Sequence, residues 1–272
     1  LVLSGITSDS IIVNPGNILQ LSGTVTVNDY LETSGSCSML SNLKGTGTLS
    51  SATGNIVINY TNIENITATG GASFVANNSY DLGGNSGWTI NSTSSQDYYW
   101  VGDGGDWNDG THWALSSGGS GSGCSPSYND NVYFDANSFS SSGQTVSISN
   151  AVADCKSMDW TGVTNDPTFD ISNSLNVYGS FTLSEDMSLI GGSDLSFKAT
   201  TTGNTVAFSG NSIGSHITFN GVGGEWTMQD SIIQSSFTNS LVISSGIFNS
   251  NGNNITTGNF NVTGSSTVNL FT

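Results

Sequence analysis

The sequence predicts an all-β protein, a parallel β-helix or β-solenoid of short strands with a Trp-rich cassette that opens one unit. Three observations predict this fold. Apolar and polar residues alternate in runs of about four to six residues, the pattern of half-buried strands, and helical spacing is absent. Strand-then-Gly marks recur at irregular intervals of about 17 to 25 residues, as in coils with variable turns. The polar remainder is mostly Ser, Thr, Asn and Gly, which suit turns and hydrogen-bonded ladders.

The charge balance excludes several classes of partner. Only 8% of the residues are charged, Arg is absent, and the formal net charge is -17. Nucleic acids and anionic membrane surfaces are bound through Lys and Arg, so neither is an expected partner. No apolar run reaches the roughly twenty residues that a membrane span needs. The chain is nevertheless 35% hydrophobic, which is too apolar for a disordered acidic segment.

The order of the elements predicts three parts. Residues 1–95 read as the end of one solenoid unit, with Phe74 and Trp88 as the large apolar anchors of a closing segment. Residues 96–165 form the Trp/Cys cassette that opens the next unit, and residues 166–272 return to solenoid rungs. Each rung hides one row of side chains, so stacking of neighbouring coils is required for stability. The alternative is a set of antiparallel β-sandwiches, which share short strands and Gly-rich turns.

The cassette has the highest density of tryptophan in the chain. Trp100, Trp107 and Trp113 follow one another at intervals of seven and six residues, with Gly-Asp turns between them. We expect these rings to be buried and to lock the start of one unit against the end of the preceding one, near Trp88. The residues assigned to this structural cassette are Trp88, Trp100, Trp107, Trp113, Phe134 and Trp160.

A resemblance rests on four runs: YYWVGDGGDWNDGTHWALSSGG, GCSPSYNDNVYFDANSF, TVSIS and CKSMDWTG. Together they resemble the repeat unit of giant secreted surface proteins of gliding Bacteroidota, the SprB-like gliding adhesins. The run ITATGGASFVANNSYDLGGNSGWTI resembles the end of the preceding unit in the same arrays, so the likeness covers roughly residues 60–165, and the remaining rungs match in style. The W…W…D-x-V-x-F layout is also similar to β-helical autotransporter passengers. The likeness to gliding adhesins implies export by the type IX secretion system, a location at the cell surface and adhesion during gliding. Asp103 and Asp106 depart from that pattern, since Gly and Asn are expected there.

Three cysteines leave one without a partner. Cys124 and Cys155 flank a predicted hairpin, and we expect a disulfide between them, as in exported proteins. Cys37 has no evident partner and is expected to be a small buried apolar residue.

Two kinds of ligand site remain open in the cassette. Asp103, Asp106 and Asp109 lie in a Gly-rich loop, and such oxygen ligands suit Ca²⁺, although the spacing matches no known calcium loop. The alternative is that they form Asx turns with their own backbone. Trp and Tyr rings also form platforms for sugars, but here we expect them to seal the core.

A catalytic centre is not expected. Hydrolysis of a polysaccharide needs a close pair of carboxylates, and the candidate pairs are Glu185 with Asp186 and Glu225 with Asp230. No recognisable nucleophile motif accompanies His112 or His216. The sequence therefore predicts a non-catalytic structural or adhesive segment of a large extracellular surface protein. Its expected partners are neighbouring units of the same chain and surface polysaccharide, and the alternative functions are a carbohydrate-binding module or a polysaccharide-active β-helix.

Overall fold

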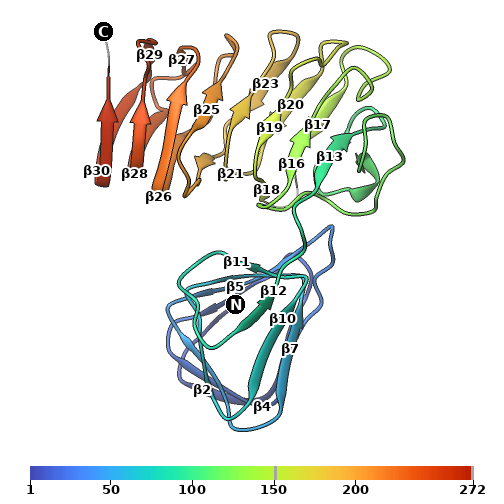
Figure 1. Ribbon diagram of the computed structural model, residues 1–272, viewed down its shortest axis with the longest axis vertical. Helices are drawn as coiled ribbons and strands as arrows, with labels where there is room; N and C mark the ends of the chain where they lie inside the picture. The colour runs from blue at the N-terminus through green and yellow to red at the C-terminus, as the bar shows by residue number, and fades with distance from the viewer. Residues whose placement is uncertain (150–151, 271–272) are drawn as a thin grey trace. The chain divides into compact units, whose positions relative to one another are not determined.

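The computed structural model describes residues 1–149 and 152–270, which form short strands that are almost all parallel (Figure 1). The only helix among them is the single 3-10 turn η1, Gly110–His112. Between named strands of the described chain, antiparallel pairing occurs only between β13 and β15. The predicted all-β solenoid is therefore confirmed, and the sandwich alternative is wrong. The chain divides into two compact units, Leu1–Ser94 and Ser95–Thr272.

The first unit is a coil whose successive turns contribute strands to three parallel sheets. The five-stranded sheet contains β1 (Val2–Leu3), β3 (Ile18–Leu21), β5 (Ser41–Gly45), β8 (Thr61–Glu64) and β11 (Tyr80–Asp81). The four-stranded sheet contains β2 (Ile6–Val13), β4 (Thr24–Thr33), β6 (Thr48–Ser51) and β9 (Thr67–Gly70). The three-stranded sheet contains β7 (Asn55–Asn59), β10 (Ser73–Asn77) and β12 (Thr89–Asn91).

Alternation along each strand builds the core of this unit. In β4, Val25 and Val27 are fully buried, while Thr24 and Asn28 on either side of them are exposed. Val25 is in register with Leu49 of β6, and Leu49 with Ala68 of β9, so one apolar row runs through consecutive coils. Stacking keeps every row in place because a shift of one residue would turn the apolar set outward.

The second unit stacks its coils in chain order from β13 to β30 (Figure 1). One long sheet contains β13 (Asp97–Trp100), β15 (Trp113–Ala114), β16 (Asn131–Tyr133), β18 (Ala153–Cys155), β19 (Met158–Asp159), β21 (Leu175–Val177), β22 (Phe181–Thr182), β24 (Leu195–Phe197), β25 (Asn204–Ala207), β26 (Ile217–Met228), β28 (Ser240–Asn249) and β30 (Asn259–Asn269). A second sheet contains β14 (Gly105–Asp106), β17 (Thr145–Ser147), β20 (Thr168–Ile171) and β23 (Ser188–Gly191). A two-stranded sheet contains β27 (Ile232–Ile233) and β29 (Ile255–Thr256).

Aromatic and aliphatic rows fill the second core. Leu175, Leu195 and Ile217 face one another across β21, β24 and β26, and all three are fully buried. Beside them, the rings of Phe197 and Phe219 stack with centroids 4.6 Å apart. The cassette and the rungs after it thus share one continuous apolar core, which begins at the cassette.

Candidate functional site

The cassette tryptophans form a fully buried aromatic cluster, here defined as Trp100, Trp107, Trp113, Phe134 and Trp160. Trp100 ends β13, Trp113 begins β15, and the other three side chains follow β14, β16 and β19. The predicted burial of Trp100, Trp107 and Trp113 is confirmed, and Phe134 and Trp160 are buried as well. The cluster comes from the first coils of the second unit and closes the start of its core.

Ring geometry within the aromatic cluster is specific. Trp113 is perpendicular to both Trp100 and Trp107, with centroids 4.9 Å and 4.8 Å away. Phe134 stacks on Trp160 with centroids 3.6 Å apart and an interplanar angle of 7°. Edge-to-face and stacked pairs add about 0.5–1.5 kcal/mol each beyond the burial of their area. The cluster is therefore a rigid end for the core and presents no ring face to solvent.

Two indole N–H groups of the cluster hold the Gly-Asp turns. Trp100 Nε1 donates to the Asp103 carbonyl oxygen at 2.6 Å, and Trp113 Nε1 donates to the Trp107 carbonyl oxygen at 2.7 Å. The Trp160 Nε1 atom is also buried, yet no described residue accepts its hydrogen bond. The Trp160 indole N–H therefore has the desolvation penalty of an unpaired buried donor, whereas those of Trp100 and Trp113 are compensated by hydrogen bonds.

His112 packs against the aromatic cluster. Its ring stacks on Trp100 with centroids 4.8 Å apart and an interplanar angle of 6°. Its Nδ1 atom lies 2.8 Å from the Val101 carbonyl oxygen, so Nδ1 carries the proton of this hydrogen bond. Its stacking partner is thus Trp100 and not Trp113, its neighbour in the sequence. Alternation alone does not distinguish the two indoles.

Trp88 packs within the first unit. Its ring meets Phe74 edge-to-face with centroids 5.4 Å apart, and it covers that unit's apolar core. The two residues that the sequence marks as anchors of the closing segment are therefore in contact. The ring partners of Trp100, Trp107 and Trp113 all belong to the second unit.

The carboxylates of Asp103, Asp106 and Asp109 accept hydrogen bonds that hold the backbone of the cassette in place. Asp103 accepts hydrogen bonds from the backbone N–H and the hydroxyl of Ser140. Asp109 caps η1 by accepting from the backbone N–H and the hydroxyl of Thr111, at 2.9 Å and 2.7 Å. Asp106 accepts hydrogen bonds from the Asn108 backbone N–H and from the hydroxyl of Ser149, which follows β17.

The hydrogen bonds of Asp103, Asp106 and Asp109 match the Asx-turn alternative to a calcium site. Within residues 1–149 and 152–270, no group of three or more His, Cys, Asp or Glu side chains is placed to hold a metal ion. Hydrogen bonds from Ser140 lower the pKa of Asp103, and those from Thr111 lower the pKa of Asp109. Backbone and hydroxyl donors stabilise these carboxylates; Asp106 and Asp109 each accept from the residue two positions on, as in Asx turns, whereas Asp103 accepts from Ser140, 37 residues away.

The predicted disulfide between Cys124 and Cys155 is also wrong. Cys155 is a free thiol that points into the core from β18, where it is fully buried. Cys37 and Cys124 are both disulfide-bonded, and Cys37 is half-buried, not a small core residue. The cause is strand alternation: Ala153 and Cys155 occupy inward positions of β18, in register with Leu175 and Val177.

Asp230, from one of the candidate catalytic pairs, and His216 make hydrogen bonds between neighbouring coils. Both oxygens of Asp230 accept hydrogen bonds from backbone N–H groups, of Phe208 and Ser209, which leaves this carboxylate committed to a turn. His216 accepts a hydrogen bond from the Ser240 N–H through Nδ1 at 3.1 Å. These contacts connect neighbouring coils of the second unit.

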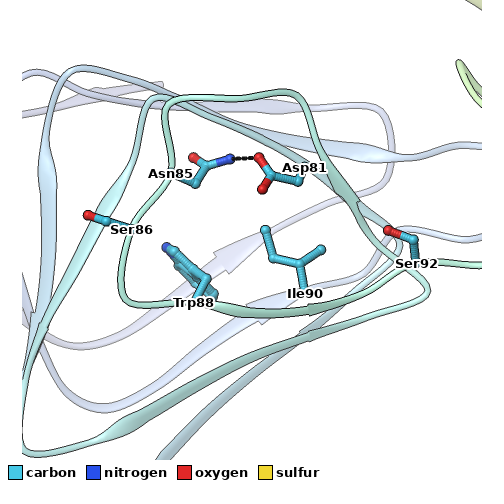
Figure 2. A pocket seen from close by; sticks show the side chains of 6 residues that line it. All are labelled: Asp81, Asn85, Ser86, Trp88, Ile90 and Ser92. Carbon is cyan, nitrogen blue, oxygen red and sulfur yellow. Dashed lines mark hydrogen bonds between the residues drawn. The ribbon is translucent and has the colours of Figure 1, made fainter.

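A small pocket lies over the last coil of the first unit. Figure 2 shows the side chains that line it: Asp81, Asn85, Ser86, Trp88, Ile90 and Ser92. The Asn85 side chain is held by hydrogen bonds to the preceding coil, because Oδ1 accepts from the Ile66 N–H and Nδ2 donates to the Ile63 carbonyl oxygen. The Nδ2 atom of Asn85 also donates to Asp81 Oδ1 at 2.6 Å, the dashed line of Figure 2.

What this pocket offers a ligand is limited. The Trp88 ring is partly exposed, but its Nε1 atom is covered and has no acceptor among the described residues. The second carboxylate oxygen of exposed Asp81 and the Trp88 ring are the groups that remain for a ligand. Sequence analysis missed Asp81 and Asn85 because neither stands in a recognisable motif.

No family model, curated protein or solved structure matches the chain. In the part of the chain that the structure describes, no helix has the length and apolar character needed to cross a membrane.

Proposed function

We propose that this chain is a non-catalytic structural segment of a large cell-surface protein, which supports adhesion or gliding by holding an extended solenoid. The observation that carries the proposal is the aromatic cluster, because its five large rings are all buried in the core and none is accessible to a substrate. A solenoid is stabilised by contacts between neighbouring coils, so its first coil is the one that most needs such reinforcement.

Two further observations support an extracellular location. Cys37 and Cys124 are disulfide-bonded, and structural disulfides persist in oxidising compartments. The low content of charged residues, 8%, leaves stability to buried rows and hydrogen bonds, which salt does not screen. The proposed partners are neighbouring units of the same protein, as the resemblance to gliding adhesins implies.

Two measurements test the proposal. Antibodies against this segment should label intact cells of the source organism, and protease added outside should remove the label. In single-molecule pulling, the chain should unfold in discrete events that need substantial force, and Trp107→Ala should lower the force for the second unit. An intracellular epitope, or unfolding without measurable resistance, contradicts the proposal.

A carbohydrate-binding module is the second candidate, and the pocket at Trp88 is the observation that favours it. An exposed carboxylate oxygen beside a partly exposed indole is a common arrangement for a sugar hydroxyl and an apolar sugar face. A glycan array probed with the intact chain and with Asp81→Ala tests it. Binding that Asp81→Ala removes supports the module, and absence of binding to all glycans eliminates it.

A further inference from the structure

One outer face of the first unit carries an ordered array of hydroxyl groups. The outward residues of the four-stranded sheet repeat as Thr-x-Thr or Thr-x-Ser over successive coils, in TVT at 24–26, TLS at 48–50 and TAT at 67–69. Strand register aligns them into two columns. We define the hydroxyl face as Thr7, Thr24, Thr26, Thr48, Ser50, Thr67, Thr69 and Ser86.

The backbone fixes the spacing of these groups in two directions. Thr24, Thr48 and Thr67 follow one another across hydrogen-bonded strands, at the interstrand distance of about 4.8 Å. Thr24 and Thr26 are two residues apart along one strand, a distance of about 6.5–7 Å. The residue between them, Val25, is fully buried and anchors the strand to the core. The result is a regular two-dimensional lattice on a rigid support.

The chemistry of this face is uniform. Every member has a small hydroxyl-bearing side chain, and the threonines add a methyl group and a stiff χ1 angle. No charged or aromatic residue occurs in the strand segments that build the lattice, at 5–8, 24–27, 48–51 and 67–70. All eight members are exposed or half-buried, so the lattice is open to solvent.

Ordinary strand preference for threonine does not account for the array. The neighbouring five-stranded sheet of the same unit has Val2, Gln20, Lys44 and Glu64 in one register column. In the second unit, Ser147, Asp170 and Ile190 share an outer column of the second sheet. The four-stranded sheet also has mixed pairs beyond the lattice, such as Ser10 with Tyr30 and Ile12 with Glu32. Uniform hydroxyl groups are therefore a property of these two columns and not of parallel strands in general.

We propose that the hydroxyl face binds the surface of ice crystals. Hexagonal ice presents a flat lattice of oxygen atoms whose two repeat distances are close to the interstrand and along-strand spacings of the face. Hydroxyl groups held at those spacings anchor ordered water, and the methyl groups between them fill the gaps of the lattice without competing for hydrogen bonds. The inference is independent of the structural role proposed above.

The same features argue against a polysaccharide as the occupant. Sugar faces are held by aromatic platforms and by carboxylates or amides in a concave site. Within residues 5–8, 24–27, 48–51 and 67–70 the hydroxyl face has neither an aromatic ring nor a charged group, and Asp9, Asp29 and Tyr30 lie further along β2 and β4, outside the lattice. Its hydroxyl groups repeat at regular intervals and do not converge on one binding centre. A repeating solid matches such a surface better than a single chain of sugar rings does.

The test is thermal hysteresis of the full 272-residue chain, measured with single ice crystals in a nanolitre osmometer. The wild type should hold crystals without growth below the melting point and change their shape. Thr48→Tyr, at the centre of the lattice, should reduce hysteresis to the level of buffer. Thr89→Tyr is the matched control, because Thr89 is exposed on a strand of the three-stranded sheet, and it should keep wild-type hysteresis.

Folding of each variant is checked by circular dichroism, and Tyr is well tolerated on outer strand positions. If Thr48→Tyr fails to fold, Thr24→Tyr replaces it, since Thr24 is exposed. Wild type without hysteresis and without adsorption to ice overturns the proposal, as does full hysteresis in a folded lattice variant. Adsorption to crystalline cellulose or chitin without any hysteresis also overturns it, in favour of a polysaccharide surface.

Discussion

Trp113 and Trp160 provide a comparison in which the same substitution should have different consequences. Both side chains are fully buried in the aromatic cluster. Trp113 Nε1 donates a 2.7 Å hydrogen bond to the Trp107 carbonyl oxygen, whereas the buried Trp160 Nε1 has no acceptor among the described residues. Replacing each by Phe removes the same atoms. Only the state of the N–H group differs.

The expected difference follows from the energetics of buried polar groups. Trp113→Phe loses a hydrogen bond and leaves a buried carbonyl oxygen without that donor, a penalty of about 1–3 kcal/mol. Trp160→Phe removes an unpaired buried donor and recovers about 1–3 kcal/mol. The penalty for the smaller ring is common to both and cancels in the comparison. Trp113→Phe should therefore be less stable than Trp160→Phe by roughly 2–6 kcal/mol.

Urea unfolding followed by indole fluorescence measures this difference. Five of the six tryptophans lie after residue 95, so the fluorescence reports mainly on the second unit. The Trp160→Phe midpoint should lie well above that of Trp113→Phe, and the slopes of the two transitions should agree. Equal midpoints, or a lower one for Trp160→Phe, would refute the assignment of hydrogen-bond states in the cluster.

Three further predictions concern single positions. Truncation of the fully buried Trp107 to Ala should destabilise the second unit by about 3–5 kcal/mol, seen as a lower melting temperature, whereas a melting curve like that of the wild type contradicts its role. Burial, then the nearby carboxylates, raises the pKa of the Cys155 thiol, so iodoacetamide at pH 8 should label it only after unfolding; labelling of the native protein would refute its core position. Desolvation raises the pKa of Asp154 against the opposing hydrogen bond from Asn176, so the ionised form opposes folding at neutral pH. Asp154→Asn should therefore resist urea better than the wild type at pH 7, and this advantage should vanish as the pH falls toward about 4, where the unfolded-state Asp also binds its proton.

Much of the fold is predictable from the sequence because strand alternation is a local signal. The buried rows through Val25 and Leu49 are visible as alternating apolar letters, and stacking is the way that such short strands bury them. Burial of Trp100, Trp107 and Trp113 is predictable for the same reason, since large rings between tight turns have few other places to go.

The site residues were less predictable because their roles depend on contacts distant in sequence. Cys155 is near Cys124 along the chain, yet its inward position on β18 turns the thiol into the core. The cassette aspartates looked like calcium ligands, but Asp103 is satisfied by Ser140, which lies 37 residues away. The hydroxyl face cannot be predicted from the sequence alone, because its columns join residues of different coils and depend on the register between strands.

In-register stacking also constrains how the length of such a chain can change during evolution. Thr48 pairs with Thr24 and Thr67, one coil before and one coil after, and most strands contact only such neighbours. Removal of a single residue within a strand would exchange inward and outward side chains from that point to the next turn. Loss or duplication of a whole coil would leave every remaining row aligned. Such a protein can therefore lengthen or shorten by complete coils. Insertions or deletions of one or two residues preserve the strand register only where they fall in its turns.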